Sequence, residues 1–284
     1  AFKIQRIDIS YNQMTGTIPS TLSLLPSLRY VDVSGNSFGG PVPAQESGSS
    51  GFGLLGHIGI AGNNFIGHIP LGLTDALTSL DLSGNNLTGG IPLEFYSKFF
   101  NLEFLALSDN PIGGNISGLL GNLGALRDLQ LSNCNLTGTL PDNVLGLTSL
   151  ENMALNNNRI NGFIPSSFGL LPRLSNLELE NNELTGPLPT QLGSLSFLNA
   201  INVSNNSLTG LLPSSLVFLT LLKEFDVSGN LFVGKVPIGI CENLEITTAM
   251  VGCDLECTCC TVNASVLQCG VNGATVGTRK FLRA

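Results

Sequence analysis

The side chains that could do acid–base or metal chemistry are few in this chain of 284 residues, which contains two histidines, His57 and His68. A catalytic triad built on His, or a His-ligated metal site, needs further groups that converge on the imidazole. His57 is predicted on an exposed strand face and His68 in the loop that follows. The two are therefore not expected to be partners, and both are interpreted as ordinary surface residues.

Carboxylates recur at one position of an alternating apolar–polar pattern, as Asp8, Asp32, Asp81, Glu178 and Asp226. Paired carboxylates could serve as general acid and base or could hold a cation. Adjacent members such as Asp8 and Asp32 would lie one strand apart. The simpler interpretation is a solvated polar face. The sequence therefore predicts no catalytic residue, no metal site and no cofactor.

Residues 51–56 match the pattern G-x-G-x-x-G. A dinucleotide-binding fingerprint must follow a strand and open a helix, whereas this stretch precedes a predicted strand at residues 55–60. Nucleotide binding is therefore not predicted. The net charge of −8 also argues against a nucleic-acid partner, because binding to a phosphate backbone needs clustered Lys and Arg.

A cluster of cysteines follows residue 240. An even number of cysteines in a short segment indicates disulfides, whose connectivity the sequence does not assign. A zinc site is the alternative, but the spacing is not that of two C-x-x-C pairs and the tail contains no His. The predicted disulfide-forming residues are Cys241, Cys253, Cys257, Cys259, Cys260 and Cys269.

The elements that position these side chains come from a repeat of about 24 residues, L-x-x-L-x-L-x-x-N-x-L-x-G-x-I-P, which recurs ten times. Gly stands four residues after the Asn position in every repeat, and Pro stands seven residues after it in all repeats except the one with Ser117. An insertion at residues 45–51 is interpreted as a surface excursion. The Asn position is occupied by Asn12, Asn36, Asn63, Asn85, Asn110, Cys134, Asn158, Asn182, Asn206 and Asn230.

Alternation at Leu177, Glu178 and Leu179 predicts a strand with one apolar and one polar face. Strands that recur in each repeat must stack in parallel, ~4.8 Å apart, and neighbouring coils close the core on each other. The Asn amide, which both donates and accepts, is expected to satisfy backbone groups where the chain turns. Cys134 would be a weaker substitute.

Residues 80–92 and 177–189 resemble the plant-type leucine-rich repeats. That family includes receptor-kinase ectodomains, receptor-like proteins and polygalacturonase inhibitors, and the resemblance covers roughly residues 1–240. It implies a repeat solenoid of the α/β-type leucine-rich-repeat class. This solenoid would be right-handed and curved, with a parallel β-sheet on its concave face. Residues 241–284 are expected to form a disulfide-rich C-terminal cap, whose cysteine cluster loosely resembles that of algal (diatom) leucine-rich-repeat proteins.

The chain starts at Ala1, without Met or a secretion signal, and lacks the Cys-paired N-terminal cap typical of this family, so it is expected to be a piece of a longer protein. No stretch of about 18 apolar residues is free of polar residues or Pro, so no membrane span is predicted within it. The pattern Asn-x-Ser/Thr is compatible with secretion. The candidate glycosylation sites are Asn86, Asn115, Asn135, Asn202, Asn205 and Asn263.

Aromatic and Arg side chains on an exposed strand face are typical of binding hot spots. Asn202 and Asn205 also map to this face, in repeat nine, where glycans would obstruct it. A protein ligand is therefore predicted to engage repeats one to seven, around Tyr11, Tyr30, Phe104 and Arg127. The predicted ligand-binding residues of the concave face are Arg6, Tyr11, Arg29, Tyr30, His57, Phe104, Arg127, Asp128, Glu151 and Asn152.

The predicted function is recognition of an extracellular protein or peptide ligand by a receptor-like protein in defence or signalling, with a co-receptor as a further candidate partner. The predicted location is extracellular, either secreted or at the cell surface. One alternative is a secreted inhibitor of a cell-wall-degrading enzyme. A structural, adhesive or ice-binding surface is the second alternative. It would need a regular array, but the Thr column before the recurrent Gly is broken at Gly39, Ile66 and Gly113.

Overall fold

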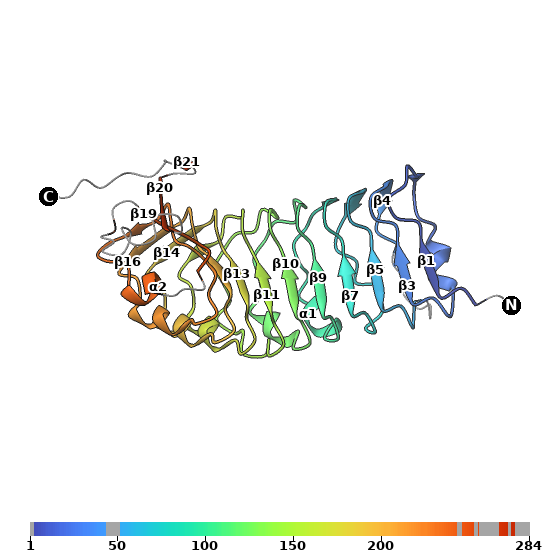
Figure 1. Cartoon of the computed structure of the whole chain (residues 1–284). Coiled ribbons are helices and arrows are strands. Elements are labelled where there is room, and N and C mark those ends of the chain that lie inside the picture. Colours follow the sequence, from blue (N-terminus) through green and yellow to red (C-terminus); the bar gives the residue numbers. More distant parts are fainter. Residues whose placement is uncertain are drawn as a thin grey trace. The chain divides into compact units, whose positions relative to one another are not determined.

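A computed structural model of the chain describes residues 3–43, 52–242, 246–252, 255, 267–271 and 274–275 (Figure 1). Of residues 241–242, 267–271 and 274–275 it describes the backbone alone. The chain divides into two parts, each of which is described by itself. The first part comprises residues 1–137 and 146–150, and the second comprises residues 138–145 and 151–284. The predicted insertion at residues 45–51 lies outside the described residues.

Each coil of the first part contributes one short strand to a parallel sheet. The central residue of a strand is buried, as at Val31, Ile58 and Leu80, while the residues on either side of it face outward. This alternation follows from the two-residue period of a strand. The strands pair in the order β1 (Arg6–Asp8), β3 (Tyr30–Asp32), β5 (His57–Gly59), β7 (Ser79–Asp81), β9 (Phe104–Ala106) and β10 (Asp128–Gln130).

The second part repeats this arrangement, with Leu177, Ile201 and Phe225 buried at the strand centres. Parallel pairing continues past residue 240, where the last predicted repeat ends, and the final short strand β21 pairs antiparallel. The order is β11 (Asn152–Ala154), β13 (Asn176–Glu178), β15 (Ala200–Asn202), β17 (Glu224–Asp226), β19 (Thr248–Gly252), β20 (Leu267–Val271) and β21 (Ala274–Thr275).

A second set of short strands forms where each coil turns away from its first strand. The recurrent Gly lies within most of these strands and just after the two that end at Leu87 and Phe232. It adopts a positive φ, for example +76° at Gly186, which disfavours any residue with a side chain. In the first part they are β2 (Thr15–Gly16), β4 (Ser37–Pro41), β6 (Asn64–Gly67) and β8 (Asn86–Leu87). In the second part they are β12 (Asn161–Gly162), β14 (Glu183–Gly186), β16 (Ser207–Gly210) and β18 (Leu231–Phe232).

Short helical turns complete most coils, and Pro precedes several of them because it lacks an N–H that the turn would leave unpaired. Where Ser117 replaces Pro, its Oγ accepts a hydrogen bond from the Leu119 N–H at 3.1 Å and caps the turn instead. The turns are η1 (Ser20–Leu24), α1 (Phe95–Lys98), η2 (Gly118–Asn122), η3 (Ser166–Leu170), η4 (Thr190–Ser194), η5 (Ser214–Phe218) and α2 (Ile238–Glu242). The predicted repeat fold with parallel strands is thus confirmed.

Most Asn side chains of the repeat are buried and bond the coils to one another, whereas Asn12 is exposed and donates to the Ile9 and Ser10 carbonyls of its own coil. Asn63 Nδ2 donates to the carbonyls of Ile60 at 3.0 Å and Ala61 at 3.2 Å, and to Val33 of the preceding coil at 3.0 Å. Its Oδ1 accepts from the Phe38 N–H at 3.0 Å. One side chain therefore satisfies four backbone groups that would otherwise be buried and unpaired. The same bonds recur at Asn36, Asn85, Asn110, Asn182, Asn206 and Asn230.

Candidate functional site

Three planar side chains stack on one another on the outward face of the strands of the first part. The guanidinium carbon of Arg6 lies 3.4 Å from the centroid of the Tyr30 ring, a cation–π contact. The ring centroids of Tyr30 and His57 are 4.2 Å apart, with an 8° angle between the ring planes. The three residues are opposite one another in strands β1, β3 and β5. In-register pairing places equivalent side chains at a stacking distance, and we call Arg6, Tyr30 and His57 the aromatic stack.

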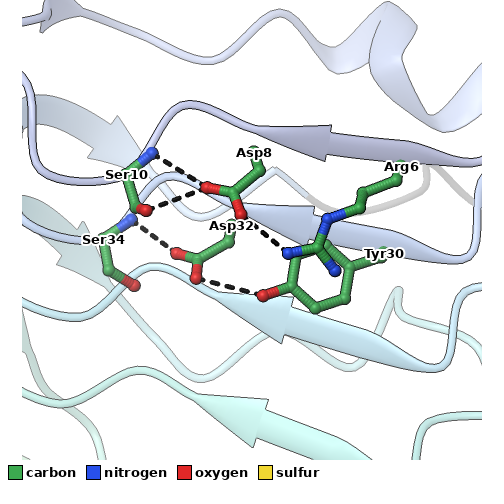
Figure 2. A network of polar contacts seen from close by, with 6 residues as sticks. All are labelled: Arg6, Asp8, Ser10, Tyr30, Asp32 and Ser34. Atoms are coloured by element: carbon green, nitrogen blue, oxygen red, sulfur yellow. Dashed lines mark hydrogen bonds and ion pairs between the residues drawn. The ribbon is translucent and has the colours of Figure 1, made fainter.

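Two carboxylates brace this stack from the same strands (Figure 2). Arg6 Nη2 lies 2.7 Å from Asp8 Oδ2, and the Tyr30 hydroxyl donates to Asp32 Oδ2 at 3.3 Å. The other carboxylate oxygen of Asp8 accepts from the Ser10 hydroxyl at 2.8 Å. Hydrogen bonds from Ser10 and Arg6 to the carboxylate lower the pKa of Asp8. Arg6 and Tyr30 are therefore held in place before any ligand arrives.

His57 closes the other side of the stack. Its Nδ1 is 2.9 Å from the hydroxyl oxygen of Ser79 on strand β7. Its Nε2 is buried and has no hydrogen-bond partner among the described residues. Burial lowers the pKa of His57, because a low-dielectric environment disfavours the charged imidazolium. Burial in the stack therefore favours the neutral form of the imidazole.

Beside the stack, the carboxylate column crosses Gly59 between Asp32 and Asp81. A Cβ added at Gly59 would lie 3.0 Å from Asp32 Oδ1 and 3.2 Å from Ser34 Oγ. The carboxylate of Asp32 thus leans over the space that Gly59 leaves. Within residues 3–43, 52–242 and the shorter described stretches, no group of three or more His, Cys, Asp or Glu could hold a metal ion.

Four residues predicted on the strand face lie outside the strands: Tyr11 follows β1, and Arg29, Arg127 and Glu151 each stand one residue before a strand. Tyr11 does not lie on a strand: β1 ends at Asp8, and Tyr11 has a left-handed φ of 53° in the turn that follows, with 85% of its surface exposed. The Asn position begins one residue later, and the turn toward it has already started at Tyr11. Its ring instead covers Gly35, where an added Cβ would lie 2.7 Å from Tyr11 Cδ1.

Arg29 is exposed immediately before β3, and Phe104 is part-buried in β9. Arg127 Nε lies 3.5 Å from Glu103 Oε2 in an exposed ion pair, and Asp128 accepts from the Gln130 amide at 3.1 Å. Glu151 and Asn152 belong to the second part. There Asn152 Oδ1 accepts from the Asn176 amide.

Serines that support the carboxylates were missed in the sequence, although a signal for them is present. The pattern Asp-x-Ser places a backbone N–H two residues after the carboxylate, where it donates to Asp Oδ1. The pattern Asp-x-Ser at the end of a strand is therefore the sequence signal for these serines. The pairs are Asp8 and Ser10, Asp32 and Ser34, Asp81 and Ser83, and Asp226 and Ser228.

The remaining predicted residues are dispersed. His68 is exposed after β6, with Nδ1 3.1 Å from the Thr88 carbonyl oxygen. Among the candidate glycosylation sites, Asn86, Asn115 and Asn135 are exposed, and Asn202 and Asn205 are part-buried. The positions that lie outside the described side chains are Asn263, Cys241, Cys253, Cys257, Cys259, Cys260 and Cys269.

The parallel strands, the buried Asn side chains and the recurrent turns define a leucine-rich-repeat solenoid. Two family models agree with this class, and the chain belongs to the leucine-rich-repeat family. The model described as "Leucine rich repeat" matches residues 124–184. A shorter model, described as "Leucine Rich Repeat", matches residues 3–25, 76–97, 101–123 and 197–219.

The chain is similar to receptor-like proteins of Arabidopsis thaliana. Receptor-like protein 54 is 34% identical over 141 residues, which cover 48% of this chain and 17% of that protein. Receptor-like protein 32 is 32% identical over 145 residues, which cover 50% of this chain and 14% of that protein. The matched region is thus less than a fifth of the length of these relatives.

Solved receptor structures share the fold. A TDR receptor superposes with a TM-score of 0.81 at 31% identity, over 89% of this chain and 43% of that chain. The leucine-rich-repeat ectodomain of the Arabidopsis receptor kinase HAESA, in complex with an N-terminally extended IDA peptide hormone, gives 0.79 at 32% identity over 87% and 41%. These similarities support receptor-like ligand binding. In the described residues, no helix is long and apolar enough to cross a membrane.

Proposed function

We propose that this chain is part of the extracellular region of a receptor-like protein, and that the strand face of its first part binds a peptide or protein ligand. The observation that carries the proposal is the aromatic stack of Arg6, Tyr30 and His57. The stack consists of outward-facing Arg and aromatic side chains, and such side chains dominate the binding energy of interfaces. The relatives, which are receptor-like proteins and peptide-bound ectodomains, support the same function.

The stack is suited to recognition because its geometry is fixed in advance. Asp8 holds Arg6, Asp32 holds the Tyr30 hydroxyl, and Ser79 contacts His57. A ligand that binds there does not have to order these side chains, so less of the interaction energy is lost as conformational entropy. The stacked rings offer a flat apolar surface, and the carboxylates offer acceptors for ligand N–H groups. In this proposal the arrangement recognises a ligand by complementary shape and hydrogen bonding, without a chemical step.

The test starts from peptides selected on the chain out of a random displayed library. We expect selected peptides to bind Tyr30→Ala and Arg6→Ala at least about tenfold more weakly, because each removes a member of the stack. The matched control is Phe163→Ala, an exposed aromatic of the second part, which should bind as the wild type does. Affinity is measured by fluorescence anisotropy with purified, folded variants.

Equal losses of affinity in the stack variants and in Phe163→Ala would contradict the proposal. It would also be contradicted if all selected peptides bound the stack variants as tightly as the wild type. A purified cell-wall-degrading enzyme is tested in parallel. Inhibition of that enzyme with no binding of peptides to the stack would favour the secreted-inhibitor alternative.

A further inference from the structure

A hollow of about 790 Å³ lies in the second part, just before the strands. One column of its lining residues, which we call the floor, lies on four successive coils: Glu151, Ser175, Asn199 and Lys223. The neighbouring lining column of Arg173, Phe197 and Leu221 is called the wall. Backbone hydrogen bonds join these coils, from Ser175 N to Glu151 O at 2.8 Å, from Asn199 N to Ser175 O at 2.7 Å, and from Lys223 N to Asn199 O at 2.8 Å. The hollow is therefore built on the rigid repeat and not on a loop.

The wall of the hollow carries large apolar side chains that do not contribute to the core of the coil. Phe197 is 57% exposed and Leu221 is 49% exposed. Each stands four residues before the buried strand centre of its coil. Before the strand centres Val31, Ile58, Leu80, Leu105 and Leu129 of the first part, the equivalent positions are Ser27, Leu54, Ala76, Asn101 and Ala125. A coil thus closes with Ala, Ser or Asn at this position, so the adjacent large residues Phe197 and Leu221 are not explained by core packing. Adjacent exposed apolar groups of this size are typical of interaction surfaces.

The charged groups of the hollow are mainly basic. Arg173 stands beside Phe197 on the wall and Lys223 lies on the floor. Neither forms an ion pair with any residue in the described part of the chain. Glu151 is the one acidic residue of the lining. In a chain of net charge −8, two basic groups beside an apolar wall favour an anionic partner by charge complementarity.

We propose that this hollow binds an extended segment of a partner protein in which an apolar side chain adjoins acidic side chains. The apolar side chain packs on Phe197 and Leu221, and the carboxylates pair with Arg173 and Lys223. All of these residues belong to the second part and none belongs to the aromatic stack. The hollow is thus a second site, and it stands or falls independently of ligand binding at the stack.

The probes are two fluorescein-labelled heptapeptides, one alternating Glu and Leu and the other alternating Lys and Leu. The acidic peptide is expected to bind the wild-type chain saturably and at least about tenfold more tightly than the basic peptide. The double variant Phe197→Ala/Leu221→Ala should weaken binding of the acidic peptide about tenfold. The double variant Arg173→Glu/Lys223→Glu should reverse the preference, so that the basic peptide binds more tightly. That reversal is a gain that a misfolded variant would not show.

Two matched controls lie in the second part but outside the lining. Phe218→Ala removes an aromatic that is 70% exposed, and Arg159→Glu reverses an exposed basic residue. Both should bind the acidic peptide as the wild type does. Three results would overturn the proposal: no saturable binding below about 1 mM, equal binding of the two peptides, or equal losses in the controls. Sedimentation velocity adds a fourth, because self-association abolished by Phe197→Ala/Leu221→Ala would assign the hollow to a second copy.

Discussion

At the scale of single residues, His57 and Glu180 show how burial changes an ionisable group in opposite directions. Burial lowers the pKa of His57 and raises that of Glu180 to about 6, because in both cases the charged form is disfavoured. Glu180 Oε2 is buried and has no hydrogen-bond partner among the described residues. At neutral pH this carboxylate is therefore ionised in a partly buried environment that disfavours its charge.

Glu180→Gln is expected to raise the thermal midpoint at pH 7.5, because the amide carries no charge to desolvate. The ordinary pKa of this group is 4.5 and the folded value is about 6, so the folded state binds more protons between these values. Stability from wild-type Glu180 therefore falls as the pH rises through this window. The advantage of the Gln variant should be largest above pH ~6 and should shrink toward pH ~4.5.

Circular dichroism melts at several pH values check this prediction, with the exposed Glu183→Gln as the control. A difference in thermal midpoint between Glu180→Gln and wild type that stays constant from about pH 4.5 to about pH 7.5 would show that the charge of Glu180 does not cost stability.

At the scale of the coil, the Asn position explains both the regularity of the strands and its one weak point. Asn182 donates to the carbonyls of Leu155, Leu179 and Glu180 and accepts from the Ile160 N–H at 3.0 Å. At Cys134 the sulfur contacts the Leu107 and Ser132 carbonyl oxygens at 3.3 and 3.4 Å. Burial raises the pKa of this thiol to about 12, so it stays protonated and is a weak donor.

A reciprocal exchange tests the Asn position. Cys134→Asn should stabilise the chain by about 1 kcal/mol, because an amide donates more strongly than a thiol to the carbonyl oxygens of Leu107 and Ser132. Asn182→Cys should destabilise it by about 2 kcal/mol, because the backbone groups bonded to the amide lose their partner in a buried site. Urea midpoints followed by circular dichroism measure both. Destabilisation by Cys134→Asn would mean that this coil has adapted its packing to sulfur.

The coil scale is also where prediction from sequence works best. The repeat places an apolar residue at each strand centre, and Val31, Ile58 and Leu177 are buried there as the alternation requires. The prediction that Tyr11 lies on a strand was wrong, because the apolar–polar alternation does not encode where the backbone turns and the strand ends. The register between Tyr30 and His57 survives an intervening longer repeat.

The side-chain geometry of the site was beyond the pattern. Arg6, Tyr30 and His57 were all predicted as exposed strand residues, but stacking depends on rotamers that Asp8 and Asp32 select. The hollow was missed for a different reason: its wall residues stand before the strand, at a position that the repeat leaves free to vary. Only a comparison of that position among coils shows that Phe197 and Leu221 are large and apolar where most other coils carry a small, polar or charged residue.

At the scale of the whole molecule, the two parts share one fold and carry different surfaces. The first has the aromatic stack braced by carboxylates, and the second has the hollow with its apolar wall and basic groups. A repeat fold allows this because each coil satisfies its core and backbone with the same few positions, and the remaining positions are free for recognition. Two surfaces on one chain are suited to a ligand and a second protein partner.

The most direct test of the central claim uses the two histidines of the chain as paired reporters. His57 lies in the aromatic stack and His68 lies after β6, so their imidazole NMR signals report on separate places. His68→Gln assigns the signals. Titration with a peptide selected on the chain should shift the His57 signals saturably, with the dissociation constant measured by anisotropy, and should leave His68 unchanged. If every selected peptide binds with its measured constant and leaves the His57 signals unmoved, ligand recognition at the stack is contradicted.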